Sequence, residues 1–113
     1  MDCIFCKISR GEIPAKILFQ DDQVVAFVDV NPQAPIHNII IPRRHIASLN
    51  ELSENDLPLL GHMIHSAKSL AKELNIAEEG YRIVMNCNAA GGQTVFHIHL
   101  HLLGGRTMTW PPG

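Results

Sequence analysis

The sequence predicts an α+β fold that combines an antiparallel, meandering sheet with one main helix. Residues 96–103 alternate polar and apolar side chains, which is the pattern of a strand with two different faces. Residues 53–75 instead repeat apolar side chains every three or four positions, as a helix with one buried face does. The 113 residues contain no repeat, low-complexity run or linker, so we expect a single domain over residues 1–113.

The first half of the chain is expected to supply a short N-terminal helix and three strands. Residues 4–8 read as the helical turn, which Gly11 and Pro14 end. The strands are predicted over residues 16–20, 24–29 and 37–41. An Asp-rich turn separates the first two strands, and Pro42 ends the third.

The main helix is predicted to bury a stripe formed by Leu57, Leu60, Ile64, Ala67, Leu70, Ala71 and Leu74. Ser53 and Asp56 resemble an N-cap pair, and Pro58 indicates that the regular helix begins near that turn. His62 and His65 lie off the stripe, so we expect both to face solvent. Beyond the helix, residues 81–87 read as a strand, and a Gly-Gly loop is expected to pair it antiparallel with residues 96–103.

Composition excludes two classes of partner. The formal net charge is −2 and no basic stripe is present, so nucleic acid is not an expected partner. No apolar run approaches the roughly 20 residues of a membrane-spanning helix. The start at Met1, Asp2 and Cys3 lacks the apolar core of a signal peptide, which favours a cytoplasmic location.

Three histidines share one face of the strand predicted over residues 96–103. His97, His99 and His101 are spaced by two, and histidine has no special strand propensity, so the row indicates a functional site. Such neighbours lie about 7 Å apart, so one zinc ion could join two adjacent rings only if the rings tilt. The alternative is that one neutral imidazole acts as a nucleophile.

The loop before these histidines contains Gly91 and Gly92 followed by Gln93 and Thr94. Paired glycines let a backbone approach a ligand closely, and successive N–H groups in such a turn can bind an anion. A loop that only needs positive φ angles is the alternative. Because this loop leads directly into the histidines, it indicates a phosphate and substitution at phosphorus.

Cysteine usage suggests half of a metal site. Cys3 and Cys6 have the C-x-x-C spacing of a zinc half-site, with His45 and His97 as candidates for the second half. The alternative is a pair of half-buried thiols at an N-terminal turn. With Cys87 the count is odd, which does not describe a disulfide framework.

The run from His97 to Leu103, His-Ile-His-Leu-His-Leu-Leu, resembles the histidine-triad motif of the HIT superfamily. The tail over residues 104–113 is similar to that of the Hint branch, the histidine-triad nucleotide-binding proteins. Residues 13–16, 31–35 and 41–45 match the branch as well. The similarity extends from about Ile4 to the last residue.

This resemblance implies a HIT-like fold and a homodimer in which the two sheets join into one. It also implies a purine nucleoside phosphoramidate hydrolase that cleaves a P–N bond and releases AMP or GMP. In that reaction His99 attacks phosphorus and forms a nucleotidyl-histidine. His101 contacts the phosphate and assists the leaving amine, while His97 and His37 orient the reacting rings.

The resemblance also implies a nucleotide-binding set of Asp29, Val30, Phe27, Ile13, Phe5, Ile8, Asn86, Gly92, Gln93, Thr94, Val95 and Trp110. In it, apolar residues wall the base and Asp29 accepts hydrogen bonds from the ribose. Thr94 stands where the family usually has serine, which keeps the hydroxyl and adds a methyl group. Without the resemblance, the apolar members would be core residues and Asp29 a solvated strand end.

The family likeness further implies a structural zinc held by Cys3, Cys6, His45 and His97, with no cofactor required for catalysis. Two other interpretations stay open. One is a zinc-dependent hydrolase in which His97 and His99 are the ligands. The other is a nucleotide-responsive binding module whose hydrolysis is incidental.

Overall fold

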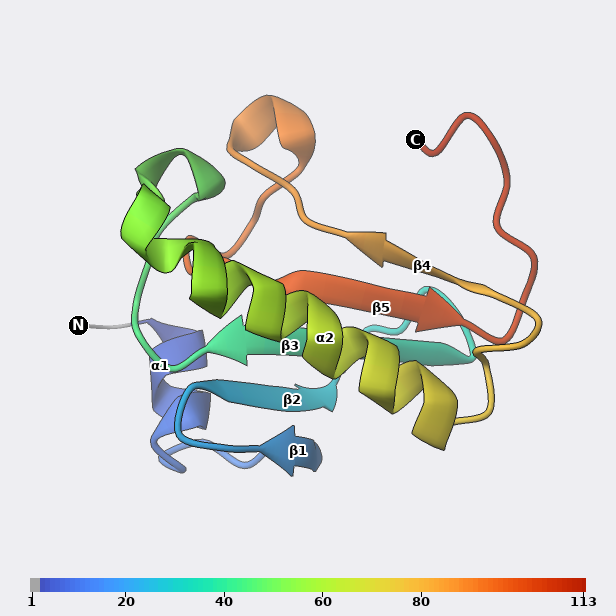
Figure 1. Cartoon of the computed structure of the whole chain (residues 1–113), viewed down its shortest axis with the longest axis horizontal. Coiled ribbons are helices and arrows are strands. Elements are labelled where there is room, and N and C mark those ends of the chain that lie inside the picture. Colours follow the sequence, from blue (N-terminus) through green and yellow to red (C-terminus); the bar gives the residue numbers. More distant parts are fainter. Residues whose placement is uncertain (1–2) are drawn as a thin grey trace.

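The computed structural model describes residues 3–113, so Met1 and Asp2, part of the N-terminal start discussed above, lie outside the described residues. The described residues form one five-stranded sheet, ordered β1-β2-β3-β5-β4 with every neighbouring pair antiparallel (Figure 1). The strands are β1 (Ile17–Gln20), β2 (Val24–Val28), β3 (Ile36–Pro42), β4 (Tyr81–Val84) and β5 (Leu100–Gly104). Only β1 to β3 meander in sequence order, because β5 lies between β3 and β4.

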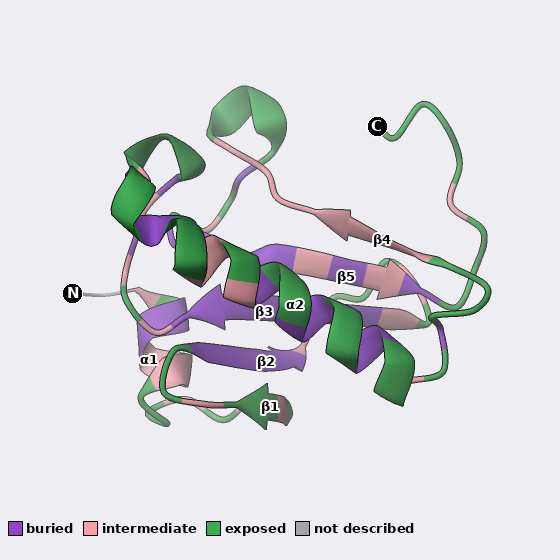
Figure 2. Ribbon diagram, viewed as in Figure 1, coloured by how far each residue is buried: buried purple, intermediate pink, exposed green. Residues whose placement is uncertain are grey.

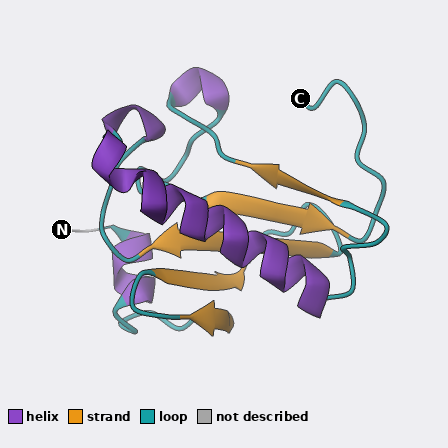
Figure 3. Cartoon of the chain, viewed as in Figure 1, coloured by secondary structure: helices purple, strands orange, loops and turns teal. Residues whose placement is uncertain are grey.

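Two α-helices accompany the sheet, as the sequence predicts (Figure 3). They are α1 (Ile4–Ser9) and the main helix α2 (Leu57–Glu73). Short 3-10 turns cover Leu49–Glu51, Glu54–Asp56 and Ala89–Gly91. The described helices include none with both the length and the apolar character needed to cross a bilayer.

The two faces of the sheet pack against different partners. On one face, α2 covers the even-numbered residues of the central strands, among them Ala26, Ile40 and Leu102. On the other face, Phe5 of α1 packs with Phe27 and neighbouring side chains of β2 and β3. The central strands are therefore buried on both faces, as Figure 2 shows for β2 and β3.

The start of α2 follows the predicted cap. The backbone N–H of Ser53 donates to Asp56 Oδ2 at 2.9 Å, and the regular helix begins only at Leu57, with Pro58 in its first turn. The predicted stripe is partly wrong, because Leu57 is 61% exposed and Ile64 is 47% exposed. Met63 is fully buried instead, one residue and hence about 100° around the helix from Ile64.

His62 does not face solvent freely, contrary to the sequence-based expectation. Its ring is half-buried, and Nε2 lies 2.6 Å from Asp21 Oδ2 in the turn before β2. The same carboxylate accepts backbone N–H groups from Gln23 and Val24 through its other oxygen. This contact joins α2 to the β1–β2 turn, a relationship between residues 41 positions apart.

The last strand is shorter than predicted. Its pairing with β3 begins only at Leu100, so residues 96–99 precede the ladder. Pro42 ends β3, and the N–H of Ile98 instead donates to the carbonyl of Ile46 at 2.7 Å. The alternation of faces nevertheless holds, since Ile98 is buried with Leu100 in the core under α2. The strand predicted over residues 81–87 is likewise shorter, because β4 ends at Val84.

Candidate active site

A pocket of about 480 Å³ lies on the face of the sheet that α1 covers. Its walls come from α1, the following loop, the ends of β2 and β3, and the segment after the Gly-Gly loop. Ten of the residues that the sequence singled out line it: Phe5, Ile8, Ile13, Phe27, Asp29, Val30, His37, Thr94, Val95 and His101. Side chains from distant parts of the sequence thus meet in one cavity.

The pocket has an apolar part and a polar part. In the apolar part, Phe5 and Phe27 meet edge to face with ring centroids 5.6 Å apart, beside Ile8 and Ile13. In the polar part, Asp29, His37 and His101 bring polar atoms within 4.8 Å of one another, and Thr94 also lines the pocket. This division suits a ligand with a flat apolar ring at one end and hydroxyl or anionic groups at the other.

His37 and His101 are hydrogen-bonded to each other, with His37 Nε2 2.9 Å from His101 Nδ1. The backbone N–H of Gln33 donates to His37 Nδ1 at 2.9 Å, so Nδ1 carries the lone pair and Nε2 carries the hydrogen. His37 therefore donates to His101 Nδ1, which leaves the hydrogen of neutral His101 on Nε2. Burial lowers the pKa of His37, and the carboxylate of Asp29 partly opposes that shift.

His101 is neutral at physiological pH. Burial, followed by the nearby rings of His99 and His37, lowers its pKa to about 4, with Asp29 acting in the opposite direction. A neutral ring whose Nδ1 accepts a hydrogen bond offers Nε2–H as a donor. Since His101 lines the pocket, that donor belongs to the pocket's polar end.

His99 is oriented by the backbone. Its Nδ1 lies 2.8 Å from the carbonyl oxygen of His97, and a carbonyl only accepts, so Nδ1 carries the hydrogen and Nε2 the lone pair. Burial lowers the pKa of His99, which keeps the ring neutral. The ring contacts Phe5 and His101 with centroids 5.0 Å away in both cases. His99 is thus an uncharged imidazole with its lone pair on Nε2; it contacts His101 of the pocket wall but is itself only 7% exposed and does not line the pocket.

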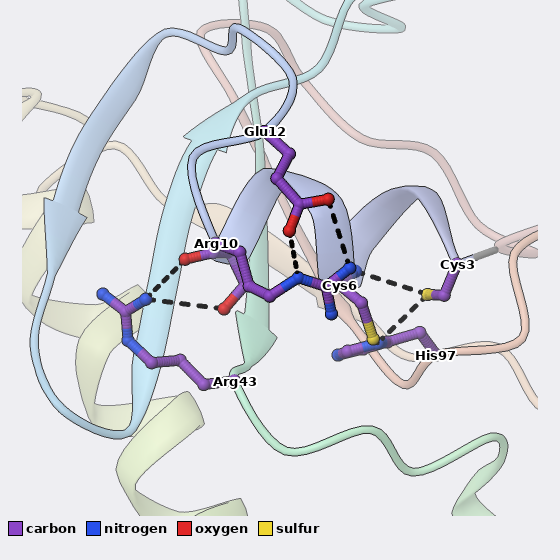
Figure 4. A network of polar contacts seen from close by, with 7 residues as sticks. Cys3, Cys6, Arg10, Glu12, Arg43 and His97 are labelled. Atoms are coloured by element: carbon purple, nitrogen blue, oxygen red, sulfur yellow. Dashed lines mark hydrogen bonds and ion pairs between the residues drawn. The ribbon is translucent and has the colours of Figure 1, made fainter. Parts of the chain in front are cut away.

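His97 faces a different group of ligand atoms, formed with Cys3, Cys6 and His45. Figure 4 shows two of these residues, Cys3 and Cys6, beside the ring of His97. Its Nδ1 lies 3.4 Å from Cys3 Sγ, 3.6 Å from Cys6 Sγ and 3.2 Å from His45 Nδ1. His45 Nδ1 in turn lies 3.4 Å from Cys6 Sγ. The four atoms all fall within 4.8 Å of one another.

This cluster fits a tetrahedral metal site. Bond lengths of about 2.0–2.3 Å place the ligand atoms of tetrahedral zinc roughly 3.3–3.8 Å apart, close to the separations found here. The Nε2 of His97 lies 2.7 Å from the carbonyl oxygen of Pro42, so it carries the hydrogen and leaves the Nδ1 lone pair for a metal. Two thiols and two imidazoles are a usual ligand set of structural zinc.

A second group of ligand atoms, from Asp29, His37 and His101, does not fit a metal in the same way. A metal bound at His37 Nε2 needs the hydrogen on Nδ1, where the Gln33 N–H already donates. His97 and His99 also fail to converge on one ion, because His97 Nδ1 faces the thiols, its Nε2 donates to Pro42, and His99 belongs to neither group of ligand atoms. The tautomers thus separate His97, whose ring faces the thiols, from His37 and His101, whose rings line the pocket.

The Gly-Gly loop is held by its own hydrogen bonds. Gly92 adopts a positive φ of 85°, as a glycine readily does. The side chain of Gln93 donates to the carbonyls of Ala47 and Val95 and accepts from the N–H of Asn88. The backbone N–H of Gln93 donates to Asn88, so Gln93 organises the loop while the following Thr94 reaches the pocket.

Asn86, Gly92, Gln93 and Trp110 are not part of the pocket wall. Asn86 follows β4 beneath the Gly-Gly loop, where Gly91 would bring a Cβ to 3.9 Å of its backbone carbon. Trp110 is 81% exposed on the C-terminal segment and contacts Arg82, whose guanidinium carbon lies 6.0 Å from the ring centroid. In one copy of the chain these residues lie outside the cavity.

Sequence reasoning missed two residues that organise the polar end. Gln33 lies in the proline-containing turn before β3, and its N–H fixes the ring of His37. Arg106 reaches the carbonyl of the same Gln33 from the C-terminal segment, through Nε at 3.2 Å and Nη2 at 3.1 Å. Both residues fall in segments that carried the family resemblance, which was the available signal.

Comparison with known proteins defines the class. The family described as "Scavenger mRNA decapping enzyme C-term binding" matches residues 2–110. The purine nucleoside phosphoramidase of Escherichia coli is 51% identical over 95% of this chain and 90% of its own length. The chain belongs to the histidine triad (HIT) family.

Two solved structures extend the comparison. A HIT family hydrolase from Legionella pneumophila superposes with a TM-score of 0.98 at 54% identity, covering 99% of this chain and 100% of the other. A zinc-bound histidine triad family protein from Mycobacterium smegmatis has a TM-score of 0.80 at 30% identity, covering 94% of this chain and 76% of the other. The predicted HIT fold is confirmed.

Proposed function

We propose that this protein hydrolyses purine nucleoside phosphoramidates, cleaving the P–N bond through a covalent nucleotide on His99 and releasing AMP or GMP with an amine. The observation that carries the proposal is the hydrogen bond from His99 Nδ1 to the carbonyl oxygen of His97, at 2.8 Å. It leaves a neutral imidazole with its reactive lone pair on Nε2. The E. coli relative named as a purine nucleoside phosphoramidase supports the choice of substrate.

In the first step the Nε2 lone pair of His99 forms a bond to the α-phosphorus. The P–N bond breaks, its electron pair goes to nitrogen, and the nitrogen takes a proton from solvent water as it leaves, because an amide anion is a poor leaving group. In the second step water attacks phosphorus and gives up a proton to solvent, the bond to His99 breaks, and the ring recovers its lone pair. The carbonyl of His97 holds the Nδ1 hydrogen throughout.

Charge on the phosphoryl oxygens is stabilised by donors at the polar end of the pocket. His101 offers Nε2–H, and Thr94, which also lines the pocket, offers its hydroxyl. Of the other predicted donors, the Gln93 side chain is used in hydrogen bonds within the loop. Asn86 lies next to Gly91 of that loop and does not line the pocket. His101 and Thr94 are therefore assigned the main contacts with the phosphate.

The nucleoside is assigned to the rest of the cavity. A purine fits between the aromatic and aliphatic side chains around Phe5 and Phe27. Asp29 Oδ1 accepts the N–H of Asn31 at 2.8 Å, while Oδ2 lies 3.3 Å from His37 Nε2. A carboxylate has about four acceptor positions, so Asp29 can also accept the ribose hydroxyls.

The two competing interpretations have less support. A metal-dependent hydrolase with His97 and His99 as ligands has less support because His97 Nδ1 faces the thiols and its Nε2 donates to Pro42, which leaves no nitrogen of His97 for an ion shared with His99. A binding module with incidental hydrolysis has no use for the oriented lone pair of a buried neutral ring. The second interpretation predicts sound AMP binding with negligible turnover, which the following experiment measures.

The test is to trap the intermediate. Protein mixed with an AMP phosphoramidate labelled at the α-phosphorus and quenched during turnover should carry an acid-labile label, and His99→Ala should carry none. His65→Ala, which removes an exposed ring on α2, is the matched control and should be labelled like the wild type. An unlabelled wild type during turnover, or a labelled His99→Ala, contradicts the mechanism.

We also propose that Cys3, Cys6, His45 and His97 hold a structural zinc ion. The proposal rests on the separations of the four ligand atoms and on the hydrogen of His97 Nε2 pointing to Pro42. A bound zinc would fix α1 against the segment that carries His99, through His97. The chemistry assigned to His99 requires no metal.

Finally, we propose a homodimer that joins two sheets along β4. That strand is an edge of the sheet, and the C-terminal segment beside it exposes Trp110. Exposed edge strands and large exposed aromatic side chains are typical of interfaces. Sedimentation equilibrium should give twice the chain mass, and Trp110→Ala should weaken the self-association; a monomeric wild type at micromolar concentration contradicts the proposal.

A further inference from the structure

The C-terminal segment is clamped onto the turn between β2 and β3. Arg106 donates from Nε and Nη2 to the single carbonyl oxygen of Gln33, at 3.2 and 3.1 Å. Its Nη1 donates to the carbonyl of Thr107 at 3.1 Å, which fixes the fork of the guanidinium. Gly105 permits this approach, because a Cβ there would lie 2.9 Å from the Cβ of Pro35.

Gln33, which Arg106 holds, also determines the tautomer of His37. The N–H of Gln33 lies 2.9 Å from His37 Nδ1, and a backbone N–H only donates. A hydrogen on Nδ1 would face that N–H directly, which disfavours both the other neutral tautomer and the doubly protonated ring. His37 is therefore held as the tautomer with hydrogen on Nε2.

This tautomer determines the next ring. His37 Nε2 lies 2.9 Å from His101 Nδ1 and 3.3 Å from Asp29 Oδ2, so His101 receives the shorter hydrogen bond. Because His101 accepts at Nδ1, its hydrogen is on Nε2. In the opposite arrangement His101 would direct a lone pair toward the bound anion, which repels it.

We propose that Arg106 is a positioning residue for the reaction, because it holds Gln33 so that the His37 tautomer keeps His101 Nε2 as a hydrogen-bond donor to the phosphoryl group. The inference deepens the proposed function and rests on it. Gln33 is itself exposed, so the turn depends on bonds of this kind for its position. The charged or titratable groups that face His101 are Asp29, His37 and His99.

The direct test is spectroscopic. Long-range ¹H–¹⁵N correlation spectra of the wild type at neutral pH should show hydrogen on Nε2 in both His37 and His101. In Arg106→Ala the two rings should become mixtures of tautomers. Arg106→Lys, which keeps the charge but lacks the fork, should give an intermediate spectrum. A wild type with hydrogen on Nδ1 of His101, or an Arg106→Ala spectrum equal to the wild type, overturns the inference.

Kinetics supply the second readout. With an AMP phosphoramidate, Arg106→Ala should lower kcat by roughly ten- to hundredfold through misplacement of the donor, with little change in KM. Arg10→Ala is the matched control, since Arg10 is an exposed arginine that pairs with Glu12; its kcat should equal that of the wild type. Equal kcat values for Arg106→Ala and Arg10→Ala overturn the inference.

These outcomes separate the inference from the proposed function. If the wild type does not hydrolyse phosphoramidates, the proposed function fails, while the spectra still decide whether Arg106 sets the tautomers. If the wild type forms the His99 adduct but Arg106→Ala behaves like the wild type, only the positioning role fails.

Discussion

His99 Nδ1 lies 2.8 Å from the backbone carbonyl oxygen of His97, and this contact joins the two halves of the candidate site. The side chain of His97 belongs to the cluster of cysteines and His45, while its backbone orients the ring that we assign as nucleophile. One residue therefore couples the side-chain cluster that we propose to hold zinc to the orientation of the lone pair that we propose as the nucleophile. Any change that moves His97 should also move the Nε2 atom of His99.

The donor role of His101 predicts a graded loss of activity. His101→Ala removes one donor to the phosphoryl oxygens, and kcat should fall by about 10²–10³ with a smaller change in KM. His101→Gln restores an N–H donor in a less constrained position and should recover part of the loss. Steady-state kinetics with an AMP phosphoramidate measure both, with His65→Ala as the control. A His101→Ala variant with the kcat of the wild type would exclude this role.

The low pKa of His101 predicts a loss of stability in acid. Its pKa is about 4 in the folded chain against an ordinary value of 6.5, so between these values the unfolded chain binds more protons. The free energy of unfolding should thus fall as pH decreases from 6.5 to 4. The difference between the two pKa values corresponds to at most about 3–4 kcal/mol. Burial also lowers the pKa of His37 and His99, which adds to the same trend.

Urea unfolding at several pH values between 7 and 4 measures this effect. His101→Gln lacks the titrating ring, so its stability should depend less on pH than that of the wild type over this interval. Parallel pH dependences for the two proteins would show that His101 does not titrate in the way described.

The local pattern predicted correctly which side chains of the histidine run face the core under α2. Alternation along residues 96–103 places Ile98 and Leu100 under α2 and leaves His99 and His101 on the other face, because side-chain direction in an extended chain is a local property. The resemblance to the HIT superfamily added Asp29 and His37, which do line the same pocket. The alternating pattern cannot show at which residue β5 begins to pair with β3. That residue depends on where β3 ends, which is a property of a distant part of the sequence.

Other features depend on contacts that no local pattern contains. The N–H of Gln33 meets His37 only because the intervening turn curls back, and Arg106 reaches that turn across 73 positions of sequence. The pairing of His62 with Asp21 is equally distant. In α2, both Met63 and Ile64 are apolar, so periodicity alone could not decide which of the two is buried.

That last difference can be measured. Met63→Ala removes a fully buried side chain beneath the sheet and should lower the free energy of unfolding by about 2–5 kcal/mol. Ile64→Ala, a change at a position that is 47% exposed, should cost less than about 1 kcal/mol. Urea denaturation of the two variants compares them directly. Equal losses of stability would mean that α2 is rotated relative to the orientation described.

Removal of metal should affect stability through α1. A zinc ion held by Cys3, Cys6, His45 and His97 stabilises the folded state by binding it and not the unfolded chain. A chelator should therefore lower the Tm of the wild type, whereas Cys3→Ser should start with a lower Tm and respond less. Cys87→Ser leaves the cluster intact and should respond like the wild type. A wild type purified without zinc, whose Tm is unchanged by added zinc, would show that the cluster packs as free thiols and imidazoles.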